Sequence, residues 1–189
     1  MSKKILSFAQ EQQKTKPKIE DIIGDMLEGD RLKNALDFIA YLREIKMNPR
    51  WNATNAWQIN YKGKFFCSIR VHGIKQSGIH YGLEPGSWHF GRNWYSFNID
   101  EDFSGEFDNS ESYEKFKEFI WSNVQPCKSQ MGCMNGSPCG HRCRTYLGKN
   151  FDEVCGLRIE NPNAEALEHT KKLIECCKKA IDGSINKPT

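Results

Sequence analysis

Residues 57–72 read WQINYKGKFFCSIRVH, and this stretch decides the fold. Apolar Trp57, Ile59 and Tyr61 alternate with polar side chains, and a second alternating run continues to Val71. A period of two is typical of strands that bury one face. The Lys-Gly pair at 62–63 separates the two runs and is typical of a tight hairpin turn. The stretch therefore predicts an antiparallel β-hairpin.

The segments on either side of the hairpin extend this prediction to a whole domain. Further strands are expected at residues 78–83, 87–90 and 95–99, with no helical pattern between them, which favours an antiparallel meander. Apolar residues at helical spacing predict two helices between Pro17 and Asn48, separated by Gly29. Other helices are expected at residues 110–124 and from Asn161, as N-cap, to Gly183, and a second hairpin at 146–157. The fold class is α+β: an antiparallel sheet packed with N- and C-terminal helices, plus a cysteine-rich loop.

The length of 189 residues suits one compact domain with an appended element. Residues 1–16 are polar and without period, so we expect a flexible N-terminal arm. A single α+β domain is expected over residues 17–183, with a cysteine-rich, metal-binding insertion at 126–156. Residues 184–189 are expected to form a disordered tail.

Charge and hydropathy narrow the possible partners and the location. The net charge of +3 is small and its basic residues are mixed with acidic ones, which argues against a nucleic-acid partner. No apolar run approaches the length of a membrane span, and the first residues do not resemble a signal peptide. We therefore expect a cytoplasmic protein without a membrane partner. In that compartment thiols stay reduced, and clustered cysteines more often bind metal than form disulfides.

Five of the eight cysteines fall within one segment of 29 residues that is rich in Gly and Pro. Structural zinc is held by four thiolates, or by three with a histidine. The candidate ligands are Cys127, Cys133, Cys139, Cys143 and Cys155, with His141 in the same segment. The spacing of Cys139 and Cys143 suits a zinc knuckle, and Cys155 could close the site from the following strand. The segment predicts structural zinc; free thiols or disulfides, and an iron–sulfur cluster, are the alternatives.

The motifs around this segment resemble a family of uncharacterised clostridial cysteine-rich proteins. They are WxNVxxC at 121–127, GKxFxxVC at 148–155, NPNAEAL at 161–167 and KNALxFIAYLR at 33–43. The helix pair, the Trp and the hairpin with its Gly-Lys turn at 63–64 more distantly resemble YdhG-like domains of unknown function. The first resemblance implies metal ligands at Cys127, Cys133, Cys139 and Cys155. Relatives carry cysteine where this chain has His169, so His169 becomes an alternate ligand.

The aromatic middle of the chain offers a second candidate site. Some of its large side chains must form core, and others are expected to line a ligand cleft: the candidates are Trp57, Arg70, Trp88 and His89. His72 and His80 lie nearby in the sequence, although polar strand residues most often simply face water. No nucleophile elbow, Walker loop, metalloprotease motif or dinucleotide fingerprint occurs.

Three functions are compatible with these features. The favoured one is a module that binds an unknown small molecule or protein and is stapled by structural zinc. The second is a thiol-based redox or metal sensor, which would need an exposed thiol of low pKa. The third is an enzyme that uses His72, His80 or His89 as a base in a pocket over the sheet.

Overall fold

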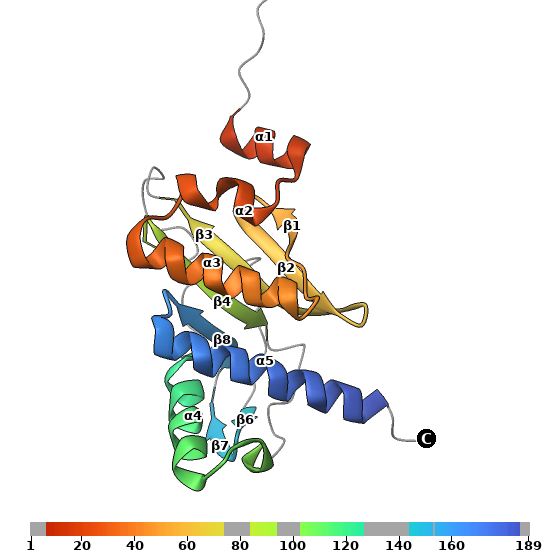
Figure 1. Ribbon diagram of the computed structural model, residues 1–189, viewed down its shortest axis with the longest axis vertical. Coiled ribbons are helices and arrows are strands. Elements are labelled where there is room, and N and C mark those ends of the chain that lie inside the picture. Colours follow the sequence, from red (N-terminus) through yellow and green to blue (C-terminus); the bar gives the residue numbers. More distant parts are fainter. Residues whose placement is uncertain (1–6, 74–83, 94–102, 127–143, 153, 186–189) are drawn as a thin grey trace, which may run out of the picture. The chain divides into compact units, whose positions relative to one another are not determined.

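The computed structural model describes residues 7–73, 84–93, 103–126, 144–152 and 154–185 (Figure 1). This part of the chain is α+β, with antiparallel strand pairs and helices at both ends of the chain. It divides into two compact units: unit 1 is Met1–Gly91 with Glu160–Ala164, and unit 2 is Arg92–Ile159 with Glu165–Thr189. A single domain was expected from the sequence. The predicted strands at 78–83 and 95–99 lie outside the described residues.

Unit 1 contains the sheet that the hairpin predicted. Strands β1 (Arg50–Ala53), β2 (Ala56–Tyr61), β3 (Lys64–His72) and β4 (Ser87–Asn93) pair antiparallel in chain order. The β2–β3 turn has only two residues, Lys62 and Gly63, with φ of 48° and 76°. Two successive positive φ angles are what a type I′ hairpin turn requires. The predicted hairpin is confirmed as β2–β3, and β4 covers the strand expected at 87–90, paired antiparallel as expected. Strand β1 was not expected from the sequence.

The register of these strands separates two faces of the sheet. Trp57 pairs with Ile69 and Ile69 with Phe90, so these three side chains share one face. This face is the apolar core, and Ile59, Val71 and Trp88 are also buried. The residues between them in sequence project from the opposite face, because strand side chains alternate. That opposite face carries Gln58, Ser68, Arg70 and His89, together with Ala56.

Helix α3 (Gly29–Glu44) packs on the apolar face. The Phe38 ring lies 5.9 Å from Trp88 and 5.3 Å from Phe90, both centroid to centroid, and Figure 1 shows α3 lying across the strands. Before it come a short helix α2 (Ile19–Ile22) and a 3₁₀ turn η1 (Ile23–Asp25). Gly29 has a left-handed φ of 56°, but it is the first residue of α3 and does not end the preceding helix, as the sequence had predicted. The second predicted helix is confirmed, whereas the first is reduced to one α-helical turn and a 3₁₀ turn.

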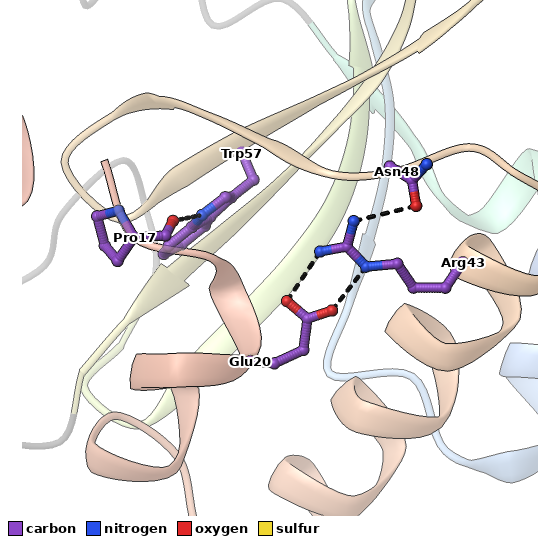
Figure 2. A network of polar contacts seen from close by, with 5 residues as sticks. All are labelled: Pro17, Glu20, Arg43, Asn48 and Trp57. Carbon is purple, nitrogen blue, oxygen red and sulfur yellow. Dashed lines mark hydrogen bonds and ion pairs between the residues drawn. The ribbon is translucent and has the colours of Figure 1, made fainter. Parts of the chain in front are cut away.

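A polar clamp holds α2 against the end of α3 (Figure 2). Arg43 donates from Nε and Nη2 to the two carboxylate oxygens of Glu20, at 2.7 and 3.0 Å. Its Nη1 donates to Asn48 Oδ1 at 3.0 Å. Beside it, the indole N–H of Trp57 donates to the Pro17 carbonyl at 3.0 Å. The chain is therefore anchored to the sheet from Pro17 onward.

The N-terminal segment differs from the flexible arm expected over residues 1–16. Residues Phe8–Thr15 form helix α1, which begins with a capping box between Ser7 and Gln10. Gln12 is buried, with hydrogen bonds to residues more than 35 positions away. A polar segment thus gains its structure from tertiary hydrogen bonds, which local periodicity does not reveal.

Unit 2 combines two helices with short strands. Helix α4 (Ser110–Ser122) begins at the N-cap Asn109 and follows a 3₁₀ turn η2 (Ser104–Glu106). Strand β5 (Val124–Pro126) pairs antiparallel with β8 (Val154–Glu160), and β6 (Arg144–Tyr146) pairs with β7 (Lys149–Phe151) as a separate ribbon. The Trp121 indole N–H donates to the Tyr146 carbonyl at 2.7 Å and ties α4 to this ribbon. The predicted helix at 110–124 is present. The second hairpin was expected at 146–157, but the hairpin of the structure spans Arg144–Phe151, and β8 pairs with β5 instead of β7.

The last helix, α5 (Ala164–Ile185), begins later and ends later than predicted. Asn161 was expected to be its N-cap, but it instead forms two hydrogen bonds with the backbone of Trp88 in β4. Its backbone N–H donates to the Trp88 carbonyl, and its Oδ1 accepts from the Trp88 N–H, both at 2.9 Å. With φ of 41°, Asn161 adopts the left-handed conformation that asparagine tolerates. Gly183 lies inside the helix because one glycine costs only about 1 kcal/mol there.

Candidate functional site

The polar face of the unit 1 sheet carries arginine, histidine and serine side chains, which can form hydrogen bonds to a ligand. Arg70 of β3 lies directly opposite His89 of β4, and His72 lies opposite Ser87. In the next row, Arg50, Gln58, Ser68 and Gly91 follow one another across the four strands. We call Arg50, Gln58, Ser68, Arg70, His72, Ser87 and His89 the polar sheet face.

Spacing within the sheet makes Arg70, His72 and His89 near neighbours. Directly opposite residues have Cβ atoms about 5 Å apart, and diagonal neighbours about 7–8 Å. Arg70 and His89 form the direct pair, and His72 is the diagonal neighbour of His89.

Two of these side chains are more buried than is usual for polar strand residues. His72 is 1 % exposed and His89 is 6 % exposed, while Arg70 is half-buried. Ser87 is also buried, and its hydroxyl donates to the Glu84 carbonyl. Polar residues that simply faced water would stay exposed, so the expectation of a solvated polar face does not fit His72 and His89.

The ionisable side chains of this face are all basic. The strand positions that form the polar sheet face carry two arginines and two histidines and no Asp or Glu. Unit 1 also has more Lys and Arg than Asp and Glu, whereas unit 2 is close to balance. A guanidinium offers a planar fork of donors that matches carboxylate and phosphate oxygens. The arrangement suits an anion.

The four residues expected to line one ligand cleft are divided between the two faces. Trp57 and Trp88 are completely buried on the apolar face, under α2 and α3, whereas Arg70 and His89 belong to the polar sheet face. The tryptophans are therefore core. Alternation in β2 and β3 could have separated Trp57 from Arg70, but the register of β4 was needed to separate Trp88 from His89.

Arg50 was missed by the sequence analysis because β1 was not predicted. It reaches the polar sheet face through its pairing with Gln58. The strand has only four residues and a register irregularity between Trp51 and Ala53, so it shows no usable period.

The expected metal site lies mostly outside the described residues. This applies to Cys127, Cys133, Cys139, Cys143 and His141, and also to His80. The backbone of Cys155 is in β8, but its side chain is outside the described part. Among the side chains that the structure describes, no three His, Cys, Asp or Glu residues are grouped as metal ligands.

His169, the alternate ligand, lies on α5 and packs against α4. Its ring stacks on Phe119, with 5.0 Å between centroids and 27° between planes, and lies 6.3 Å from Phe116. In the described part of unit 2 this histidine contributes to aromatic packing between the helices.

Comparisons with known proteins give no further guide to this site. The chain matches no protein-family model, no curated protein and no solved structure. The resemblance to clostridial cysteine-rich proteins remains an expectation from the motifs quoted above. No helix within the described ranges is long and apolar enough to cross a membrane.

Proposed function

We propose that unit 1 is a ligand-binding module whose polar sheet face binds a small anionic group, a carboxylate or a phosphate. The observation that carries this proposal is the direct pairing of Arg70 with His89, beside the buried His72. Arg70 supplies the charge and a bidentate donor fork. The imidazoles of His72 and His89 and the Ser68 hydroxyl lie on the same face and are further groups able to donate hydrogen bonds.

Calorimetric titration of the whole protein with inorganic phosphate, at low ionic strength, tests this function. We expect saturable binding, and Arg70→Ala should weaken it about 10- to 100-fold, since a hydrogen bond to a charged group is worth about 1.5–3 kcal/mol. Lys33→Ala is the matched control: it removes one positive charge from the exposed surface of α3 and should leave affinity unchanged. Acetate in a parallel titration separates carboxylate from phosphate recognition. Absence of binding in the wild type, or an equal loss in both variants, contradicts the proposal.

We also propose that the cysteine-rich segment of unit 2 binds structural zinc. The supporting observation is the β5–β8 pairing: Pro126 lies opposite Val154, so the residue that precedes Cys127 in sequence lies beside the backbone next to Cys155. Two cysteines 28 positions apart are thereby attached to neighbouring strand ends. The β5–β8 pairing already closes the chain segment between these two cysteines, so a metal ion bound by both would not have to close it. Thiolates are strong zinc ligands.

Elemental analysis of tag-free protein, purified under reducing conditions, tests the zinc proposal. One zinc per chain with eight titratable thiols after denaturation is the expected result. Iron with inorganic sulfide would instead indicate a cluster, and no metal with fewer than eight thiols would indicate disulfides. Either result would overturn structural zinc.

A further inference from the structure

Within unit 1, the side chain of Gln12 connects helix α1 to the β1–β2 turn. Gln12 is the only buried residue among its eight residues. Its Nε2 donates to Asn55 Oδ1 at 2.7 Å, and its Oε1 accepts from the Asn55 backbone N–H at 2.9 Å and from the Trp51 indole N–H at 3.3 Å. An isolated helix this short is marginal in water, so α1 depends on this docking.

Asn55 connects the docked helix to the polar sheet face. It lies in the β1–β2 turn with a left-handed φ of 57° and is 4 % exposed. Its carbonyl accepts from the Val71 N–H at 3.0 Å, and the next residue, Ala56, lies opposite Arg70. The hydrogen bonds of Gln12 thus hold the residue that aligns the Arg70–His72 end of β3.

The chain from Pro17 onward has its own attachment to the core, separate from that of α1. Lys16 ends α1 in the left-handed region, with φ of 46°, and the Pro17 carbonyl is held by Trp57. Lys16 therefore marks the boundary between α1 and the segment held by Trp57. Because the Gln12 contacts are hydrogen bonds that water can replace, each contributes only modestly to the free energy of docking.

We propose that α1 is a strap that regulates the anion site: docking of Gln12 on Asn55 positions Arg70 and His72, and undocking weakens anion binding. This inference rests on the proposed function of the polar sheet face. Gln12 acts here as a positioning residue through Asn55 and does not touch the ligand. Couplings of this kind typically change affinity about 5- to 150-fold.

The test compares the full-length wild type with Gln12→Ala and with Gln12→Asn, whose shorter amide does not reach Asn55. Gln13→Ala is the control, because Gln13 is exposed on the same helix. We expect both Gln12 variants to bind inorganic phosphate about fivefold or more weakly than the wild type. The Val71 amide should exchange faster with D₂O, and the Arg70 Nε–H resonance should shift. Gln13→Ala should behave as the wild type in all three measurements.

The outcomes separate this inference from the proposed function. A wild type that binds no phosphate overturns the anion site and its regulation together. Normal phosphate binding in both Gln12 variants overturns the regulation alone. Unchanged Val71 exchange and an unchanged Arg70 resonance also overturn it, because the path through Asn55 would then be absent.

Discussion

At the residue scale, the described thiols differ from those of a redox sensor. The side chains of Cys67, Cys176 and Cys177 are all buried. Burial raises the pKa of the Cys176 thiol to about 11, although the nearby Lys172 ammonium acts in the opposite direction. Reactive cysteines are exposed and have a lowered pKa. A redox function would therefore have to come from the cysteine-rich segment.

We expect Cys67, Cys176 and Cys177 to resist alkylation in the native protein. A thiol with a pKa of about 11 is only about one ten-thousandth thiolate at pH 7, and the thiolate is the nucleophile. Peptide mass spectrometry after a short iodoacetamide pulse, with a guanidine-denatured sample as the control, measures this. Rapid native labelling of Cys176 would show that its helix opens readily.

At the element scale, ion pairing between α2 and α3 supplements apolar packing. Ile19 and Ile23 are buried in this region, and the Glu20–Arg43 clamp closes its outer side. The hydrogen bond from Arg43 is the main cause that lowers the Glu20 pKa, and the same bond raises the pKa of Arg43. Both side chains are about one-third exposed, so solvent screens the pair.

Glu20→Gln should lower the free energy of unfolding by about 0.5–1 kcal/mol at pH 7, the upper range for a partly exposed pair. Because the folded-state pKa of Glu20 is lowered, its contribution is present above the unfolded carboxyl pKa of about 4.3 and is lost as pH falls through the lowered value. Urea unfolding of both proteins at pH 7 and pH 3 measures this.

The difference between Glu20→Gln and the wild type should thus shrink at pH 3. Asp37→Asn is the control, since Asp37 is exposed in the middle of α3 and should show no comparable effect at either pH. A Glu20 effect that is equal at pH 7 and pH 3 would mean that packing, and not charge, accounts for it.

At the scale of the whole molecule, the two proposed sites belong to different units. The polar sheet face is in unit 1, while the strands that flank the cysteine-rich segment, β5, β6 and β8, are in unit 2. Metal binding free energy is folding free energy for the segment that it closes. Metal removal should therefore act on one unit and spare the other.

Treatment with EDTA under reducing conditions should accelerate amide exchange in β8 and α5 of unit 2. Exchange in β2, β3 and α3 of unit 1 should stay unchanged, as read by hydrogen exchange with mass spectrometry. Cys155→Ser should show the fast unit 2 exchange before chelation and little further change after it. Equal acceleration in both units, or none, would contradict a staple confined to unit 2.

The sequence by itself determined two central elements of unit 1, the β2–β3 hairpin and helix α3. Alternation and the Lys62-Gly63 turn were sufficient for the β2–β3 hairpin, because hairpin register follows from turn geometry and side-chain period. Helical spacing with Gly29 as a break was likewise sufficient for α3. These signals are local, so no other part of the chain is needed to detect them.

Only the tertiary structure decided which face each candidate residue occupies and what holds α1. The β3–β4 register placed His89 opposite Arg70 and placed the Trp88 side chain on the buried, apolar face. Gln12 donates a hydrogen bond to Asn55, 43 residues away in sequence. Asn161 accepts a hydrogen bond from the Trp88 N–H instead of capping the last helix. Pairings between distant segments depend on the packing of the whole unit. The sequence around a polar residue does not identify the distant residue to which it will hydrogen-bond.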